Sequence, residues 1–217
     1  MKNITTILAG LRKTVRGFDG PAVSLVIAEY GRDPFFILVS CLLSLRTKDT
    51  ISLPVSLKLF QSVKNFKELA AMPRATLESI IHSTGFYRQK AKQLQAIAHE
   101  IVTHHGGKVP NTREALLALP GVGLKTANLV LAEAFGIPAL CVDTHVHRIS
   151  NRLGLVATRT PEETEQALQK VLPRKQWSEW NRLLVVFGQH VCTPQSPHCS
   201  TCPLLKLCPR VGVKRSR

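Results

Sequence analysis

The sequence predicts an all-α protein, and three observations carry this prediction. Apolar residues recur at helical spacing through most of the 217 residues, for example over 88–105 and 145–155. The strict alternation typical of half-buried strands is scarce. Hydrophobic residues make up 44% of the chain, which argues against disorder and is sufficient for a real core in one domain or two small lobes.

The expected helices follow one another with recognisable start and stop signals. The segment "FFILVSCLLSL" is continuously apolar and predicts a buried helix, and "GGKVP" carries the glycine and proline typical of a helix end. A stripe of Trp177, Trp180, Leu184, Phe187 and Val191 predicts core packing for the last helix. The other expected helical segments are 76–83, 88–105, 112–119, 124–136 and 145–155.

The charge balance limits the function classes. Lys and Arg total 29 against 14 acidic residues, a formal net charge of +15. A basic solvated surface or attraction to anionic lipid would also fit. We favour a nucleic-acid partner, because no basic amphipathic membrane helix stands out and no apolar run approaches the ~18 residues that span a bilayer. The N-terminal segment is interpreted as the first helix of a cytoplasmic protein with no membrane partner.

The stretch "LPGVGLKTANLVLAEAFG" places a lysine where a helix begins. Gly121 and Gly123 permit backbone angles closed to other residues and close approach of another chain. The unpaired amides of a helix starting near Leu124 favour a phosphate anion. Lys125 lies in the first helical turn, where the macrodipole opposes a cation and so favours the neutral, nucleophilic amine. A packing corner with a phosphate-binding lysine is the alternative.

The stretch "CVDTHVHRI" supplies a carboxylate. Asp143 precedes an amphipathic helix and is expected to accept hydrogen bonds from its first amides as the N-cap. Such bonds favour the ionised form, and a permanent negative charge would stabilise a cationic sugar transition state. A purely structural cap is the alternative.

Four cysteines near the C-terminus predict a metal site. Cys192, Cys199, Cys202 and Cys208 have the spacing C-x6-C-x2-C-x5-C, which fits an iron–sulfur cluster or a structural zinc. We favour iron–sulfur, because structural zinc sites with four cysteines usually use two C-x2-C knuckles and only one is present. The other two cysteines, Cys41 and Cys141, lie in apolar runs and are expected to be inert core residues.

A faint internal repeat relates residues 80–98 to residues 117–134. Each segment has the pattern of two helices joined by a glycine turn.

Together, "LPGVGLKTAN", "VDTHVHR" and the four-cysteine loop resemble the endonuclease III family of base-excision DNA glycosylases over nearly the whole chain. The resemblance implies a six-helix barrel lobe over 27–137 containing a helix-hairpin-helix at about 114–133. It implies a second, discontinuous lobe of 1–26 plus 138–217, with a structural [4Fe-4S] cluster in the loop 192–208.

The resemblance also implies an activity and its residues. A monomer acting on double-stranded DNA, nucleoid-associated if bacterial, would remove oxidised pyrimidines and nick the abasic strand. Lys125 would form a Schiff base with the sugar, and Asp143 would face it across a cleft. The expected DNA contacts are Arg46, Thr47, Phe86, Gly121, Val122, Gly123, Thr144 and His145.

Two positions depart from the family pattern. Arg46 stands where a glutamine is usual, in a loop expected to fill the hole left by the flipped base, and arginine can bind guanine in a bidentate manner. We therefore expect a bias towards lesions opposite guanine. Phe86 stands where an aliphatic wedge is usual; it would stack in the opened duplex, with burial in the barrel as the alternative.

Other functions are less consistent with these residues. A mismatch-specific glycosylase of the same superfamily usually lacks the lysine that is present here at position 125. A non-catalytic helix-hairpin-helix DNA-binding protein would leave the combination of Lys125 and Asp143 unexplained.

Overall fold

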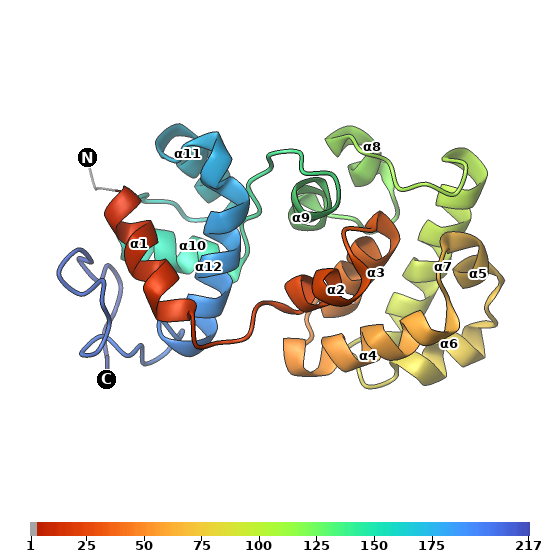
Figure 1. The fold of residues 1–217 in the computed structure, drawn as a ribbon, viewed down its shortest axis with the longest axis horizontal. Coiled ribbons are helices and arrows are strands. Elements are labelled where there is room, and N and C mark those ends of the chain that lie inside the picture. Colours follow the sequence, from red (N-terminus) through yellow and green to blue (C-terminus); the bar gives the residue numbers. More distant parts are fainter. Residues whose placement is uncertain (1–3) are drawn as a thin grey trace. The chain divides into compact units, whose positions relative to one another are not determined.

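The protein is built from helices joined by short loops (Figure 1). The computed structural model describes residues 4–217, and this part of the chain contains no β-strand, so the all-α prediction is confirmed. None of its helices combines the length and apolar content needed to cross a bilayer.

The chain forms two compact units, and one of them is discontinuous. Residues 21–137 form one unit, and residues 138–217 form the other together with the described part of the N-terminal segment up to Gly20. The first boundary falls six residues before the predicted position. The reason is that α2 (Ala22–Tyr30) packs against the two helices that follow it and so belongs with them.

The 21–137 unit contains eight helices, and two of them are only six residues long. The predicted buried helix is α3, all of whose residues from Phe35 to Leu43 are buried. An aromatic cluster from α2, α3, α4 and α5 completes the core around Phe60. After α2, its helices are α3 (Pro34–Ser44), α4 (Asp49–Ser62), α5 (Phe66–Ala71), α6 (Arg74–Ile81), α7 (Tyr87–His104), α8 (Arg113–Ala118) and α9 (Leu124–Ala134).

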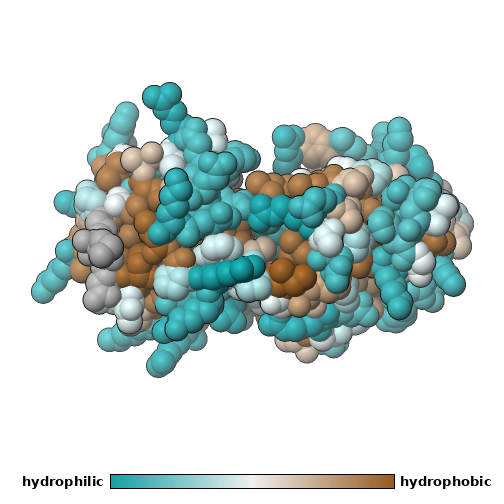
Figure 2. Space-filling view, turned by 90° about the horizontal axis from the view of Figure 1, so that it is seen from above, coloured by the Kyte–Doolittle hydropathy of each residue, from teal (hydrophilic) through white to brown (hydrophobic). Residues whose placement is uncertain are grey.

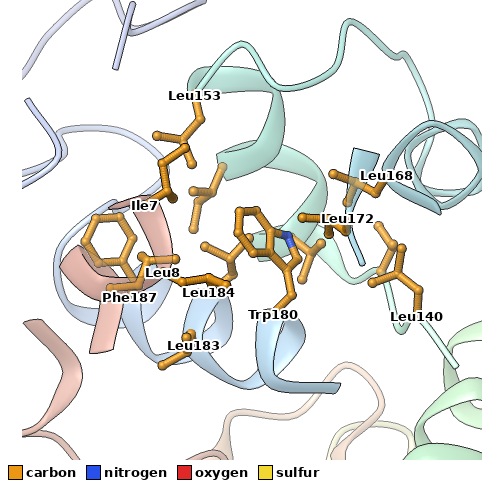
Figure 3. Packing of buried hydrophobic residues seen from close by; sticks show 14 of the residues in the cluster. Ile7, Leu8, Leu140, Leu153, Leu168, Leu172, Trp180, Leu183, Leu184 and Phe187 are labelled. Atoms are coloured by element: carbon orange, nitrogen blue, oxygen red, sulfur yellow. The ribbon is translucent and has the colours of Figure 1, made fainter. Parts of the chain in front are cut away.

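The discontinuous unit packs around one tryptophan. Trp180 is fully buried, with Leu184 and Phe187 beside it, so the predicted core stripe is confirmed (Figure 3). Leu204 from the cysteine loop joins this core, and a Cβ at Gly10 would lie 2.6 Å from its side chain. The helices are α1 (Ile4–Val15), α10 (Thr144–Arg152), α11 (Pro161–Val171), the 3-10 helix η1 (Arg174–Gln176) and α12 (Trp177–His190).

Polar side chains start several helices and cover much of the surface. Asp33 accepts a hydrogen bond from the Phe35 amide (2.8 Å) ahead of Pro34, the arrangement favoured at a helix N-terminus. Hydrophilic side chains project over much of the face seen in Figure 2, in keeping with the net charge of +15.

Candidate functional site

The predicted glycine hairpin lies between α8 and α9. Gly121 has φ 70°, in the left-handed region, and a Cβ there would lie 2.2 Å from Nε2 of Gln93. The left-handed backbone favours glycine here, and a larger residue would also displace the flexible Gln93 side chain. Gly123 differs from the prediction: its φ of −93° is open to any residue, although a Cβ there would meet nothing within 4 Å. Its absent side chain leaves the N-terminus of α9 open to a close approach.

Val122 does not present a side chain to solvent. It is buried, and its amide donates to the carbonyl of Leu119 at 3.1 Å, closing the turn. A molecule that binds this turn would therefore contact the backbone of Gly121 and Gly123 and not the Val122 side chain.

Lys125 is the second residue of α9 and is exposed. Gly123, the N-cap, has no side chain to bond the first amides of this helix, so they remain oriented as anion donors. Behind Lys125 the helix is held rigidly, because Thr126, Ala127 and Asn128 are all buried.

Cys41 lies on α3 beneath this helix and is inert, as predicted. Burial raises the pKa of its thiol to about 12, while the positive charge of Lys125 acts in the opposite direction. A thiol with so high a pKa is neither a nucleophile nor a metal ligand at neutral pH.

Asp143 caps α10 as expected. One carboxylate oxygen accepts hydrogen bonds from the amides of His145 (2.9 Å) and Val146 (2.8 Å), and the residue is only 9% exposed. A buried carboxylate held by two amides is fixed in position and oriented by its helix. The capping half of the prediction is confirmed.

The residues after Asp143 divide into one exposed and one packed side chain. Thr144 is exposed, whereas His145 is half-buried against α12, where a Cβ on Gly188 would lie 2.4 Å from its Nδ1. The guanidinium of Arg148 lies 3.1 Å from the same nitrogen. This histidine is thus held by packing as well as by its helix.

Arg46 and Phe86 lie together on two adjacent turns, and both have left-handed backbone angles (φ 52° and 58°). The Arg46 guanidinium stacks over the Phe86 ring, 5.6 Å from its centroid. Phe86 is 60% exposed, so the alternative of burial in the barrel is wrong. A strained backbone that exposes an aromatic and a cation is more typical of a binding site than of a packing corner.

The four cysteines of the C-terminal loop line one cavity. Burial raises the pKa of the Cys202 thiol, the hydrogen bond with the Leu204 backbone acts in the opposite direction, and the charges of Cys192, Cys208 and Cys199 raise it further. Within residues 4–217, however, no three His, Cys, Asp or Glu side chains converge on the position of a single metal ion.

Two arginines that the sequence analysis did not single out anchor this loop to α10. Arg152 is buried and donates to Sγ of Cys192 (3.3 Å) and to the carbonyls of Thr193 (2.8 Å) and Pro194 (2.6 Å). Arg148, one turn earlier, donates to the Cys192 carbonyl at 2.9 Å. The sequence pattern that could have identified these two residues is their i,i+4 spacing on a helix whose opposite face is strongly apolar.

Comparison with known proteins places these features in a family. Residues 39–174 match the family model "HhH-GPD superfamily base excision DNA repair protein". Endonuclease III of Thermotoga maritima is 51% identical over 176 residues, covering 81% of this chain and 83% of that protein. Endonuclease III of Bacillus subtilis is 42% identical over 186 residues, covering 85% and 84%.

Solved structures agree with the sequence matches. A non-covalent endonuclease III–DNA complex superposes with a TM-score of 0.84 and 36% identity, covering 97% of both chains. A trapped covalent endonuclease III–DNA intermediate superposes with a TM-score of 0.81 and 34% identity, also over 97% of both chains. The chain therefore belongs to the endonuclease III family of HhH-GPD base excision DNA repair proteins.

Proposed function

We propose that this protein is a base excision repair DNA glycosylase with AP lyase activity, removing oxidised pyrimidines from double-stranded DNA. The observation that carries the proposal is Lys125, exposed in the first turn of α9 behind a glycine turn that leaves the helix N-terminus open. The covalent endonuclease III–DNA intermediate of a relative with the same fold supports a nucleophilic mechanism.

In the proposed reaction Lys125 attacks C1′ of the flipped nucleotide. The amine nitrogen forms a bond to C1′, the glycosidic bond breaks, and the base leaves with the bonding electrons. The amine loses a proton as the sugar opens to an imine. Removal of a C2′ proton then expels the 3′ phosphate by β-elimination. Flipping the base costs a few kcal/mol, less for a weakly paired lesion.

Asp143 supplies the fixed negative charge. Its two amide hydrogen bonds hold the carboxylate in place. A preorganised charge of this kind stabilises positive charge developing on the sugar without reorganisation during the reaction. Asp143 thus combines capping with electrostatic stabilisation.

The remaining predicted residues divide between phosphate and base contacts. The backbone of the Gly121–Gly123 turn is suited to phosphate. The α10 N-terminus is already capped by Asp143, so the predicted contacts of Thr144 and His145 would come from their side chains. The Arg46–Phe86 pair is suited to the opened base stack, since an aromatic ring stacks on bases and a guanidinium binds guanine edges. Monomeric state and a cytoplasmic, nucleoid-associated location stay predictions.

The cysteine loop is suited to a [4Fe-4S] cluster held by Cys192, Cys199, Cys202 and Cys208. The four thiols share one cavity, and the surrounding Leu204 and Arg152 tie that cavity to the core and to α10. Such a cluster is usually bound by cysteine thiolates, and when bound it would cross-link the loop. The chain's own contribution is to fix this loop in one conformation.

Replacing Cys202 with serine should therefore release iron and loosen the loop. We expect protein purified without oxygen to lose most of the iron and the broad visible absorption of the wild type. Its melting temperature should fall by several degrees, since Leu204 packs in the core next to this residue. Cys41→Ser is the matched control, because Cys41 is a buried thiol in the other unit. Zinc in place of iron in the wild-type protein would contradict the cluster assignment.

A panel of duplexes tests the function as a whole. Each duplex carries one oxidised pyrimidine, one mismatched thymine or adenine, or an abasic site, opposite each of the four bases. We expect release of the oxidised pyrimidines, nicking at the abasic site, and roughly tenfold faster release opposite guanine than opposite adenine, since one bidentate contact discriminates by about 1–3 kcal/mol. Arg46→Gln should remove that preference and retain excision. Release of mismatched bases alone would favour a mismatch glycosylase, and no reaction on any duplex would favour a binding protein.

A further inference from the structure

Helix α7 carries side chains that tie together the turns assigned above to DNA. Phe86 is the N-cap of this helix, and Lys90 and Gln93 follow at i+4 and i+7 on the same face. We propose that Lys90 and Gln93 are positioning residues that lock the Arg46 turn, the Phe86 turn and the glycine hairpin into one rigid wedge. The inference rests on the proposed function, because it assumes that these turns enter or grip DNA.

The Lys90 ammonium is placed for this role inside the unit. The residue is only 5% exposed, and its Nζ donates to the carbonyl of Leu43 (2.7 Å) and to Oγ1 of Thr47 (2.7 Å). A buried lysine is costly unless its donors are satisfied, so these bonds hold α7 firmly against the segment that carries Arg46. Burial lowers the pKa of Lys90 to about 8, which leaves the ammonium form dominant at neutral pH.

Thr47 is the point where the two turns meet. Its hydroxyl accepts from Lys90, accepts from the Gly85 amide (3.2 Å), and donates to the Leu45 carbonyl (3.3 Å). A hydroxyl has one donor and two acceptor positions, so all three are used. We therefore assign the Thr47 side chain to holding the turns and not to the direct DNA contact expected from the sequence.

The two turns are also in close van der Waals contact. A Cβ at Gly85 would lie 3.0 Å from the Arg46 carbonyl oxygen. Glycine at this position therefore lets the Phe86 turn approach the Arg46 turn closely enough for the guanidinium to stack over the ring. The stack is thus built into the fold and does not have to be assembled on the DNA.

Gln93 extends the same connection to the glycine hairpin. Its Nε2 donates to the carbonyls of Pro120 (3.2 Å) and Gly121 (2.9 Å). Because three residues of α-helix rise about 4.5 Å, α7 sets a fixed spacing between the Lys90 contacts and the glycine hairpin. The Arg46 and Phe86 turns, which would separate the bases, and the glycine hairpin, which would bind the DNA backbone, would then move as one rigid body.

The test compares base excision with nicking of a ready-made abasic site, both at saturating enzyme in a single turnover. Lys90→Met removes the donors and keeps the apolar stem, and Thr47→Val removes the hydroxyl and keeps the shape. We expect each to slow excision of an oxidised pyrimidine by roughly 10- to 100-fold, the size expected for a misplaced group remote from the chemistry. Nicking at the abasic site, which requires less opening of the duplex, should fall less than about threefold.

Matched variants separate this role from simple loss of stability. Lys92→Met removes a lysine from the exposed face of the same helix, and Thr47→Ser keeps the hydroxyl; both should behave like the wild type. The effects of Lys90→Met and Thr47→Val should be less than additive in the double variant, because both remove the Lys90–Thr47 bond while each also removes bonds of its own, to Leu43 in one case and to Gly85 and Leu45 in the other. Gly85→Ala, whose Cβ would lie 3.0 Å from the Arg46 carbonyl oxygen, should displace the two turns slightly and slow excision in the same direction.

The outcomes distinguish the inference from the proposed function. If wild-type protein excises no base, the proposed function fails. If Arg46→Ala and Phe86→Ala impair excision but Lys90→Met and Thr47→Val only lower the melting temperature, the positioning role alone is wrong. If Arg46→Ala and Phe86→Ala leave excision unchanged, the wedge assignment fails and the inference with it.

Discussion

Replacing Lys125 with glutamine is expected to abolish covalent trapping of the protein on DNA by borohydride. Borohydride reduces an imine to a stable amine, so a trapped adduct requires a lysine or other amine bonded to the sugar. We expect both base release and strand nicking to fall by roughly 10⁴- to 10⁶-fold, the scale typical for loss of a nucleophile. The measurement is denaturing gel electrophoresis of labelled duplex after reaction in the presence and absence of borohydride.

Lys125→Arg separates the nucleophile from the phosphate-binding alternative. Arginine keeps the positive charge and the ability to bind phosphate, but its guanidinium does not deprotonate to a nucleophile in proteins. If Lys125 acts as the nucleophile, Lys125→Arg binds DNA and gives no adduct. Wild-type turnover by Lys125→Arg would make Lys125 a phosphate contact and assign the nucleophile elsewhere.

Replacing Asp143 with asparagine should slow the chemistry far more than it weakens DNA binding. Asparagine caps helices about as well as aspartate, so the bonds to the His145 and Val146 amides can persist while the charge is lost. We expect the single-turnover rate of base release to fall by roughly 10²- to 10³-fold, the usual effect of removing a preorganised electrostatic group. The dissociation constant for an abasic-site duplex should change less than about threefold.

Two further aspartate variants calibrate this effect. Asp143→Ala removes the cap as well as the charge and should lower the free energy of unfolding by about 0.5–2 kcal/mol beyond Asp143→Asn. Asp33→Asn changes an exposed aspartate cap on α3 in the same way and should leave the rate unchanged. Should Asp143→Asn lose DNA affinity and keep its rate on bound DNA, Asp143 would be reduced to a structural cap.

Local patterns were sufficient for most helices and for the backbone positions of Lys125 and Asp143. The start of α9 at Leu124 and the cap at Asp143 follow from glycine permissiveness and from carboxylate bonding to amides, both of which involve neighbours in sequence. The buried helix α3 follows from its unbroken apolar run. Helices α2, α4, α5 and α11 were not anticipated. In α4 the interior Pro54 is a residue that usually ends or kinks a helix, and α5 has only six residues.

Contacts between distant residues escaped the sequence analysis. Lys90 has the sequence context of an exposed helical lysine, and only the approach of the Leu43–Thr47 segment encloses it. Arg152 likewise bonds residues forty positions away in the cysteine loop. The predicted DNA contact of Val122 also depended on tertiary packing. The sequence did not indicate that the turn would direct the Val122 side chain into the core.

The sequence by itself determined the all-helical class, the glycine turn before Lys125, the cap at Asp143 and the cysteine spacing, because each depends on neighbours only a few residues away. Only the tertiary structure decided that Arg46 stacks on Phe86, that Lys90 and Gln93 bind the turns around them, and that two arginines hold the cysteine loop. These features depend on which backbone segments meet after folding. A buried charge or a stacked cation is stable only once those segments have surrounded it.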